Sequence, residues 1–448
     1  MSSKVRADPT KAFFVRMLTR DITLDDCILD LIDNSVDGAW AHSGEDPAII
    51  EKSDTLSDYQ IDIKFDGSSF SISDNCGGIT LDNATSYAFT FGRDPDAPEA
   101  DNYSVGVYGI GMKRAVFKIG NDVRIQSTYS DNGGTDSFAV PINVKDWMQE
   151  SKPPWDFDLE QATPAQEPGV RIDITGLSRE TSTRFASPAY TTALRRVLAR
   201  DYMLPLMRGL RISVNGEPVH GWTLDFREGD DFKPLRDKYA DNGVDIEVIA
   251  GMVTAPPVDS GPDDNDPSKH DTSGWYVFCN GRAVLAGDTS RVTGWGEGDV
   301  PKWHRQYSGF AGLVLFSSKE SIKLPMTTTK RSVDEGSAIY RRALQKMAVP
   351  TKAWTSYTNT RRNALEEAGA KEEMTRSVPL AAVPLSKMIA LPKLKRISAR
   401  QEIANVNYAV AVKSIRSLAA AFGDVTMTYR DTGLRAFDYA YDDLVAHD

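Results

Sequence analysis

Polar side chains recur at helical spacing along residues 24–43, and their types suit a site for a metal ion or a charged ligand. Asp26, Asp30, Asn34 and Asp37 fall at i, i+4, i+8 and i+11, so a helix would place them on one face. The side-chain carbonyl of Asn34 is a hard oxygen ligand that suits Mg²⁺, which takes a few protein oxygens together with phosphate and water. A solvated polar face would show the same spacing, so this helix alone does not establish a site.

A second group of residues ends a stretch that alternates between apolar and polar side chains. The sequence "DNCGGI" occupies residues 74–79. The carboxylate of Asp74 could accept a hydrogen bond from an exocyclic amine such as that of adenine. The two glycines, Gly77 and Gly78, favour either a tight turn or a backbone that passes close to a ligand.

A third group is the glycine-rich sequence "VGVYGIGMK" at residues 105–113, which ends a long loop over residues 92–112 and opens a helix. Free N–H groups and the positive end of the helix dipole suit a phosphate at such a place. The chain contains no G-x-x-x-x-G-K-[ST] motif, so the site is not a Walker site. The three groups in this order indicate a nucleotide-binding site.

The elements that would position these groups can be read from local patterns. Thr23 and Asp26 indicate the start of the first helix, and Gly44 indicates its end. A hairpin is expected over residues 59–73. Further strands and helices are expected in this order: a helix from Met112, a hairpin over 123–142, a strand over 169–177, a helix over 191–207 that closes the first domain, strands over 210–219, 245–253, 274–285 and 310–318, and mostly helices from Ala338.

Composition sets the outer limits of the interpretation. The 448 residues suggest two or three domains, and the net charge of -11 argues against a protein that coats nucleic acid or an anionic membrane with its whole surface. The cysteines Cys27, Cys76 and Cys279 lie too far apart for a zinc motif or a disulfide framework. The chain shows neither a signal-peptide pattern nor an apolar run of transmembrane length. We therefore expect a cytoplasmic protein without a membrane partner.

The motifs together resemble the GHKL superfamily, whose members share the Bergerat ATP-binding fold and include DNA gyrase, ninety-kilodalton heat-shock chaperones, MutL, histidine kinases and MORC ATPases. "DLIDNSVDGA" resembles the first motif of the superfamily, "DNCGGI" the second, and "GVYGIGMK" the third, in the form of chaperone-like and MORC-like members. "KLPMTTTKRSVDEGSAIYRRALQKM" resembles the transducer segment of bacterial chaperone-like ATPases.

The resemblance implies an α+β fold in three parts. A Bergerat α/β sandwich would span residues 1–205, a transducer-like α/β domain similar to a ribosomal-protein fold would span 206–350, and a mostly helical region would span 351–448. The transducer-like part argues against a histidine kinase.

The resemblance also assigns roles to residues. Asn34 corresponds to the Mg²⁺ ligand, Asp74 to the carboxylate that reads adenine, and Gly78 to the glycine under the base. Asp30 corresponds to the general base, and Lys330 to a transducer lysine that reaches the terminal phosphate. The other residues expected to contact ATP are Asp37, Ile79, Gly106, Val107, Gly109, Ile110, Gly111, Met112 and Lys113. For Lys113 and Lys330, an ordinary surface cation is the alternative.

Three positions depart from the pattern of the superfamily. Asp30 stands where Glu is usual and is one methylene shorter, so we expect slow turnover. Cys76 replaces the first glycine of the second motif, and the extra Gly77 is expected to move the flexibility of the turn by one residue. Val170 stands where many members have a Thr that bonds the adenine-reading Asp.

Three functions remain open at this point. The first is an ATPase that acts as a conformational switch and closes as an ATP-dependent homodimer on an unidentified protein partner. The second is an ATP-sensing module with negligible hydrolysis. The third is a clamp associated with nucleic acid, supported only by the basic residues Lys387, Lys393, Lys395, Arg396 and Arg400. A place in a bacterial antiviral defence system is implied by the family alone.

Overall fold

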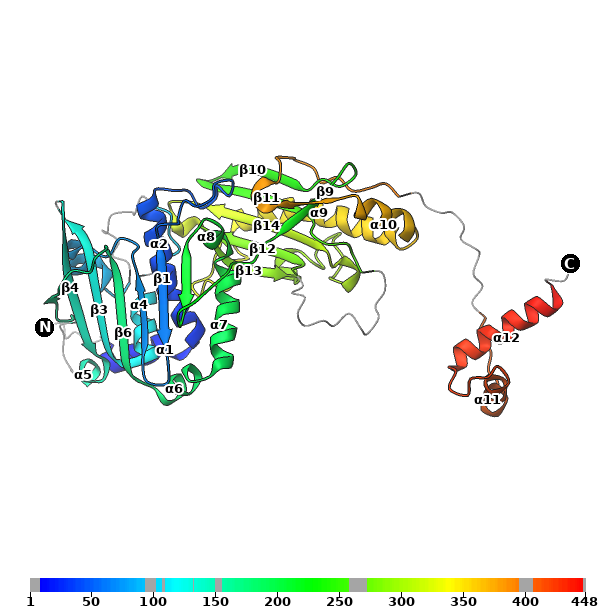
Figure 1. Cartoon of the computed structure of the whole chain (residues 1–448), viewed down its shortest axis with the longest axis horizontal. Coiled ribbons are helices and arrows are strands. Elements are labelled where there is room, and N and C mark those ends of the chain that lie inside the picture. Colours follow the sequence, from blue (N-terminus) through cyan, green and yellow to red (C-terminus); the bar gives the residue numbers. More distant parts are fainter. Residues whose placement is uncertain are drawn as a thin grey trace, which may run out of the picture. The chain divides into compact units, whose positions relative to one another are not determined.

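The computed structural model of the chain describes residues 9–92, 102–106, 109–131, 133–149, 155–257, 272–394 and 406–445 (Figure 1). The chain forms two compact units, Met1–Arg396 and Ile397–Asp448, and each is treated by itself below. None of the helices in these ranges combines the length and the apolar character that a membrane span requires.

The first unit begins with a mixed sheet that carries the residues of interest. Its eight strands among the described residues have the order β5-β4-β3-β6-β2-β1-β7-β8. Neighbouring strands are antiparallel except for β1 and β7, which are parallel. The strands are β1 (Gln60–Phe65), β2 (Phe70–Asp74), β3 (Gly120–Asp131), β4 (Gly134–Asn143), β5 (Glu160–Gln161), β6 (Gly169–Leu177), β7 (Arg211–Val214) and β8 (Glu217–Pro218).

Helices accompany this sheet, and most of them share one apolar core with it, whereas α3 has no buried residue and Met203 and Leu204 of α8 belong to a separate cluster. They are α1 (Lys11–Arg20), α2 (Leu24–Ser43), α3 (Leu81–Asn83), η1 (Ala84–Ala88), α4 (Gly111–Ile119), α5 (Val144–Gln149), α6 (Arg179–Phe185), α7 (Pro188–Asp201) and α8 (Met203–Met207). Helix α2 begins with a capping box between Thr23 and Asp26, and it ends at Gly44 in the left-handed conformation. These are the caps that the sequence predicted.

The expected boundary at residue 205 does not match the sheets. The sequence analysis assigned residues 210–219 to the second domain, but β7 pairs with β1 in the first sheet, with Ile61 opposite Ile212. Ile212 and Val214 are buried in the core of that sheet. A strand of four residues carries no local sign of which distant strand it will pair with, which is why the prediction was wrong.

The second sheet lies in the same unit. Its five strands among the described residues have the order β10-β11-β14-β12-β13, and β12 and β14 run parallel. The strands are β10 (Leu235–Asp241), β11 (Val244–Met252), β12 (Gly274–Cys279), β13 (Arg282–Asp288) and β14 (Phe310–Ser317). Strand β10 was not predicted, and neither were β9 (Asp225–Glu228) and β15 (Arg376–Pro379), which pair with each other.

Helix α9 (Ala338–Arg361) contacts β11 and β14 and begins at the predicted residue. It continues through Pro350, so the expected boundary at residue 350 falls inside a helix and does not hold. The elements that complete this unit are the short helices η3 (Arg291–Thr293), η4 (Arg305–Tyr307), η5 (Ser321–Lys323) and η6 (Leu380–Ala382), together with α10 (Leu365–Glu373).

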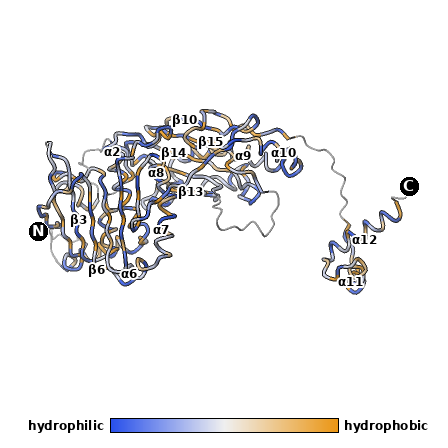
Figure 2. Tube along the Cα trace, viewed as in Figure 1, coloured by the Kyte–Doolittle hydropathy of each residue, from blue (hydrophilic) through white to orange (hydrophobic). Residues whose placement is uncertain are grey.

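The second unit contains two helices, α11 (Val412–Ala421) and α12 (Tyr429–Leu444), within the described residues 406–445. Hydrophobic and hydrophilic residues are interspersed along both helices (Figure 2).

Candidate functional site

The residues singled out in the sequence line one pocket of the first unit, with a cavity volume of about 390 Å³. Its walls come from α2, the turn after β2, the start of α4, strand β6 and the loop before α9. The predicted residues that line it are Asp30, Asn34, Asp37, Asp74, Gly78, Ile79, Gly106, Gly109, Ile110, Gly111, Met112, Lys113 and Lys330. Val107 lies outside the described residues. The residues are thus gathered in one place, and their individual roles stay predictions.

The turn after β2 depends on its two glycines. Gly77 and Gly78 both have positive φ, at 106° and 75°, which side chains rarely tolerate. A Cβ on Gly78 would lie 2.0 Å from the carbonyl oxygen of Thr128, and one on Gly77 would lie 1.9 Å from the ring of His42. The packing of the protein itself therefore requires these glycines, in addition to any need of a ligand. Positive φ thus occurs at Gly77 and Gly78 and not at Cys76. This agrees with the expectation that the flexibility of the turn moves by one residue where Cys76 replaces a glycine.

Asp74 is held in the pocket by three hydrogen bonds. Its Oδ1 accepts the N–H of Cys76 at 2.9 Å and the N–H of Val170 at 3.2 Å, and its Oδ2 accepts the hydroxyl of Ser35 at 2.6 Å. Burial raises the pKa of Asp74, while the hydrogen bond from Ser35 acts in the opposite direction. Sequence reasoning expected a weakened partner at Val170 and missed Ser35, although this serine stands in the first motif directly after Asn34.

Asn34 is exposed in the pocket, and its side chain forms no hydrogen bond with another described residue. No group of three or more His, Cys, Asp or Glu side chains in the described part of the chain could hold a metal by itself. Mg²⁺ is usually bound by few protein oxygens, and phosphate and water occupy its remaining coordination positions. A single amide oxygen, that of Asn34, matches this pattern. The residues present therefore fit a magnesium ion that arrives with a phosphorylated ligand.

Asp30 is buried between two cations. Its Oδ2 lies 2.6 Å from a terminal nitrogen of Arg114 and 2.7 Å from the Nε of the same residue, and its Oδ1 lies 3.2 Å from the Nζ of Lys330. Arg114 belongs to α4, directly after the third motif. Sequence reasoning missed it, because nothing local shows that a helical arginine points at α2.

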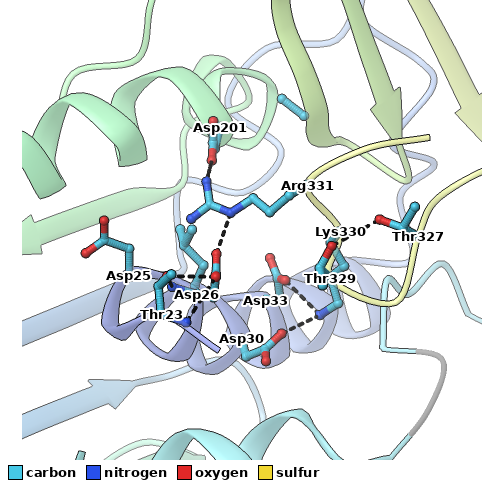
Figure 3. A network of polar contacts seen from close by, with 12 residues as sticks. Thr23, Asp25, Asp26, Asp30, Asp33, Asp201, Thr327, Thr329, Lys330 and Arg331 are labelled. Atoms are coloured by element: carbon cyan, nitrogen blue, oxygen red, sulfur yellow. Dashed lines mark hydrogen bonds and ion pairs between the residues drawn. The ribbon is translucent and has the colours of Figure 1, made fainter. Parts of the chain in front are cut away.

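Lys330 comes from the second half of the chain and enters the pocket through a tight turn. Its φ is 55°, an uncommon value for a residue with a side chain, and its N–H donates to the carbonyl of Thr327. Its Nζ lies 2.8 Å from the Oδ2 of Asp33 (Figure 3). Burial opposes the charge of this lysine, but Asp33 and Asp30 raise its pKa. Lys330 is therefore no surface cation.

Asp33 is almost fully buried and joins several elements. It accepts the hydroxyl of Tyr202 at 2.7 Å and the Nε of Arg282 at 3.0 Å, in addition to Lys330. Burial works against its ionisation, yet the two cations lower its pKa below the ordinary value. The sequence analysis did not include Asp33, although it stands three residues after Asp30 and four before Asp37, a spacing that places all three on one face of the helix.

A second cation of the same loop also contacts α2. Arg331 pairs with Asp26 at 2.6 Å and with Asp201 at 3.3 Å (Figure 3). Arg282 reaches Asp201 at 3.1 Å. The loop around residue 330 is thus tied to the first domain by two adjacent cations.

Asp37 holds a short segment of the long loop. Its carboxylate accepts the N–H of Val105 at 2.9 Å and that of Gly106 at 3.0 Å. Val105 is buried in the core of the second sheet, and the carbonyl of Ser104 accepts the side-chain amide of Asn280 at 2.8 Å. Residues 102–106 therefore connect α2 with the second sheet.

Lys113 is buried, so the alternative of an ordinary surface cation does not hold for this residue. Its Nζ donates to the carbonyl of Ala88 at 2.9 Å. Burial lowers its pKa to about 8. The lysine joins the start of α4 to η1, and its contact with a phosphate stays a prediction.

Comparison with known families supports the interpretation of this pocket. Residues 22–166 match the family model described as histidine kinase-, DNA gyrase B- and HSP90-like ATPase. No curated protein matches the chain. The matched range includes the walls from α2 to α4, but not Val170 or the loop with Lys330. The match agrees with the superfamily and the α+β class predicted from the motifs.

The buried carboxyl of Asp37 makes stability depend on pH. Burial raises its pKa to about 7, above the value of about 4 expected in the unfolded chain. The folded state therefore holds the proton more tightly, and the stability that this contributes at low pH is lost as the pH rises from about 4 through about 7. The unfolding free energy of the protein should fall over this range relative to that of Asp37→Asn, measured by urea unfolding at several pH values. Parallel curves for the two proteins would contradict the assignment.

Proposed function

We propose that this member of the GHKL superfamily binds Mg-ATP in the pocket and uses it to switch the contact between its two α/β domains. The observation that carries the proposal is the position of Lys330. This residue lies almost three hundred positions from Asp33 in the sequence and still reaches the same pocket. A nucleotide bound there would meet residues from both domains.

The pocket offers suitable partners for each part of ATP. The volume of about 390 Å³ lies within the usual range for ligand sites. Asp74 can accept the exocyclic amine of adenine, and α4 presents its N-terminus to phosphates. Asn34 would hold Mg²⁺ together with phosphate oxygens, and the ion would supply positive charge that bridges phosphate oxygens.

Hydrolysis would depend on the release of Asp30. In the structure both oxygens of this carboxylate face cations, Arg114 and Lys330. Both cations gain a second anion to pair with when a triphosphate is bound. Asp30 would then be free to orient a water molecule and accept its proton. Its short side chain favours slow turnover.

Two connections would transmit the presence of the nucleotide to the second domain, which we propose to be a transducer. One is the loop with Lys330 and Arg331, and the other is the segment 102–106 held by Asp37. Both touch α2 at the pocket and both belong to, or pack on, the second sheet. We propose that their rearrangement closes two protomers into an ATP-dependent dimer on a protein partner.

An ATP sensor without significant hydrolysis is the second candidate, and the two ion pairs of Asp30 favour it. The nucleic-acid clamp gains no support from the structure: Lys395, Arg396 and Arg400 lie outside the described residues, and Lys387 and Lys393 remain its only described basic residues. No described residue bears on a role in antiviral defence.

Release of phosphate distinguishes the ATPase from the sensor. The purified protein should hydrolyse Mg-ATP slowly, and Asp30→Asn should lower kcat by at least about a hundredfold, because a positioned general base contributes on this scale. Nucleotide affinity, measured in parallel by calorimetry, should persist in the variant. Equal phosphate release from the two proteins would remove Asp30 from catalysis, and the absence of release from the wild type would favour the sensor.

Asp74 should determine the preference for adenine. Losing a hydrogen bond to a charged group costs roughly 1.5–3 kcal/mol, so Asp74→Asn should bind ATP at least about tenfold more weakly. Asp173→Asn on the neighbouring strand β6 is a matched control, because this carboxylate is only partly buried and pairs only with Arg171 among the described residues. Equal affinities of the wild type for ATP and GTP in calorimetry would contradict the assignment.

Lys330 should act on turnover more than on binding. A cation at the transferring phosphoryl group stabilises the transition state, and its loss costs on the order of a hundredfold in kcat. Lys330→Met should therefore lower kcat by about this factor and change ATP affinity only a few-fold. Arg331→Met is the control, since this neighbour binds the same helix but does not line the pocket. Equal loss of kcat in the two variants would indicate that both substitutions act by weakening the contact of the loop with α2, and that Lys330 does not act on the phosphate.

A further inference from the structure

The first unit contains a second cavity that is large enough for a small ligand. Its volume of about 680 Å³ lies within the usual range for ligand sites. It is lined by residues of β1, β7 and α8, by the segment 219–225, and by residues 379–381. None of its described lining residues also lines the first cavity. It is therefore separate from the proposed ATP site.

The apolar walls of this cavity come from two separate clusters of buried side chains. Leu210 and Val219 belong to the core of the first sheet, whereas Met203 and Leu224 belong to a cluster that contains residues of the second sheet. Trp222 packs against both clusters and is only partly buried. An indole ring and a thioether are favourable neighbours for an aromatic ring. The walls thus suit an aromatic group.

The polar part of the lining follows from the register of two parallel strands. In β1 and β7 every second side chain is buried in the core of the first sheet, so the side chains between them point to the opposite face. Gln60 pairs with Arg211, and Asp62 pairs with Ser213. All four line the cavity. A guanidinium and a carboxylate therefore occupy diagonal positions on one face of the sheet.

Neither of these two charges is neutralised by another described residue. The side chain of Asp62 accepts only the hydroxyl of Ser213, at 2.6 Å. The guanidinium of Arg211 forms no ion pair and reaches only the amide oxygen of Gln60, at 3.5 Å. A second carboxylate of the lining, Asp225, accepts a serine hydroxyl at 3.0 Å. Two carboxylates and one guanidinium disfavour an anion that carries no positive group.

We infer that this cavity binds a free α-amino acid with an aromatic side chain. The ammonium group of the ligand pairs with Asp62, its carboxylate pairs with Arg211, and its ring packs against Trp222 and Met203. An α-amino acid carries opposite charges on a single carbon, which matches two unpaired opposite charges on neighbouring strands. The inference rests on this cavity alone and does not depend on the proposed ATP site.

Calorimetry on the full chain with L-phenylalanine, in the absence of nucleotide, tests the inference. L-Phenylalanine should bind. L-Phenylalaninamide lacks the carboxylate and N-acetyl-L-phenylalanine lacks the ammonium group, so each should bind at least about tenfold more weakly. L-Alanine keeps both charges but lacks the ring, and it should also bind at least about tenfold more weakly. No binding of L-phenylalanine, or equal affinity for either derivative, would overturn the inference.

Substitutions in the floor of the cavity locate the binding. Asp62→Asn and Arg211→Gln should each weaken the binding of L-phenylalanine at least about tenfold. Neither side chain is buried, so the unfolding temperature without ligand should stay close to that of the wild type. Asp173→Asn is the matched control, because Asp173 lies on the same face of the same sheet but does not line the cavity. Wild-type affinity in the two cavity variants, or an equal loss in the control, would contradict the assignment.

Discussion

The contact of Lys330 with Asp30 and Asp33 is the interaction on which the rest of the first unit depends. Two carboxylates on one buried stretch of α2 would be costly without a compensating cation. Lys330 supplies that charge from the loop before α9, with Arg282 of β13 and Arg114 of α4 beside it. Removing one partner of such a buried pair typically costs about 3–5 kcal/mol. The same ion pairs therefore join the two sheets, and they lower the pKa of Asp33.

This arrangement would let a ligand in the pocket change the contact between the two sheets, as the proposed function requires. A ligand shifts an equilibrium only through a difference in its interactions with the two states. Under the proposed function, a polyphosphate placed at the start of α4 would compete with Asp30 for Lys330 and Arg114, the groups that pair with α2. The segment 102–106 adds a second connection, because Asp37 holds its backbone while Val105 is buried in the core of the second sheet. The pocket and the second sheet are therefore connected by direct contacts, without a chain of intermediate residues.

Much of the site could be predicted from local patterns, whereas the partners that are distant in sequence could not. The caps of α2, the β1–β2 hairpin and the glycines beside Asp74 depend on neighbours in sequence, so their residue types were informative. Asp33, Arg114 and Arg282 look like ordinary charged residues until the fold brings them together. The same holds for β7, whose partner β1 lies about 150 residues earlier. The burial of Lys113 could not be predicted either, because no local pattern shows that a lysine at a helix start is buried.

The aspartate at position 30 is consistent with an ion-paired resting state. A Cβ at Gly111 would lie 3.3 Å from the Cγ of Asp30, so α4 approaches this side chain closely. The short carboxylate still reaches Arg114 on one side and Lys330 on the other. A glutamate would place its carboxylate over an ångström farther from α2 and would have to fold back to keep both contacts. The shorter acid thus suits the contact between the two sheets. Under the proposed function, the same shortness would leave the carboxylate farther from an attacking water, so that stable packing and slow hydrolysis would have one cause.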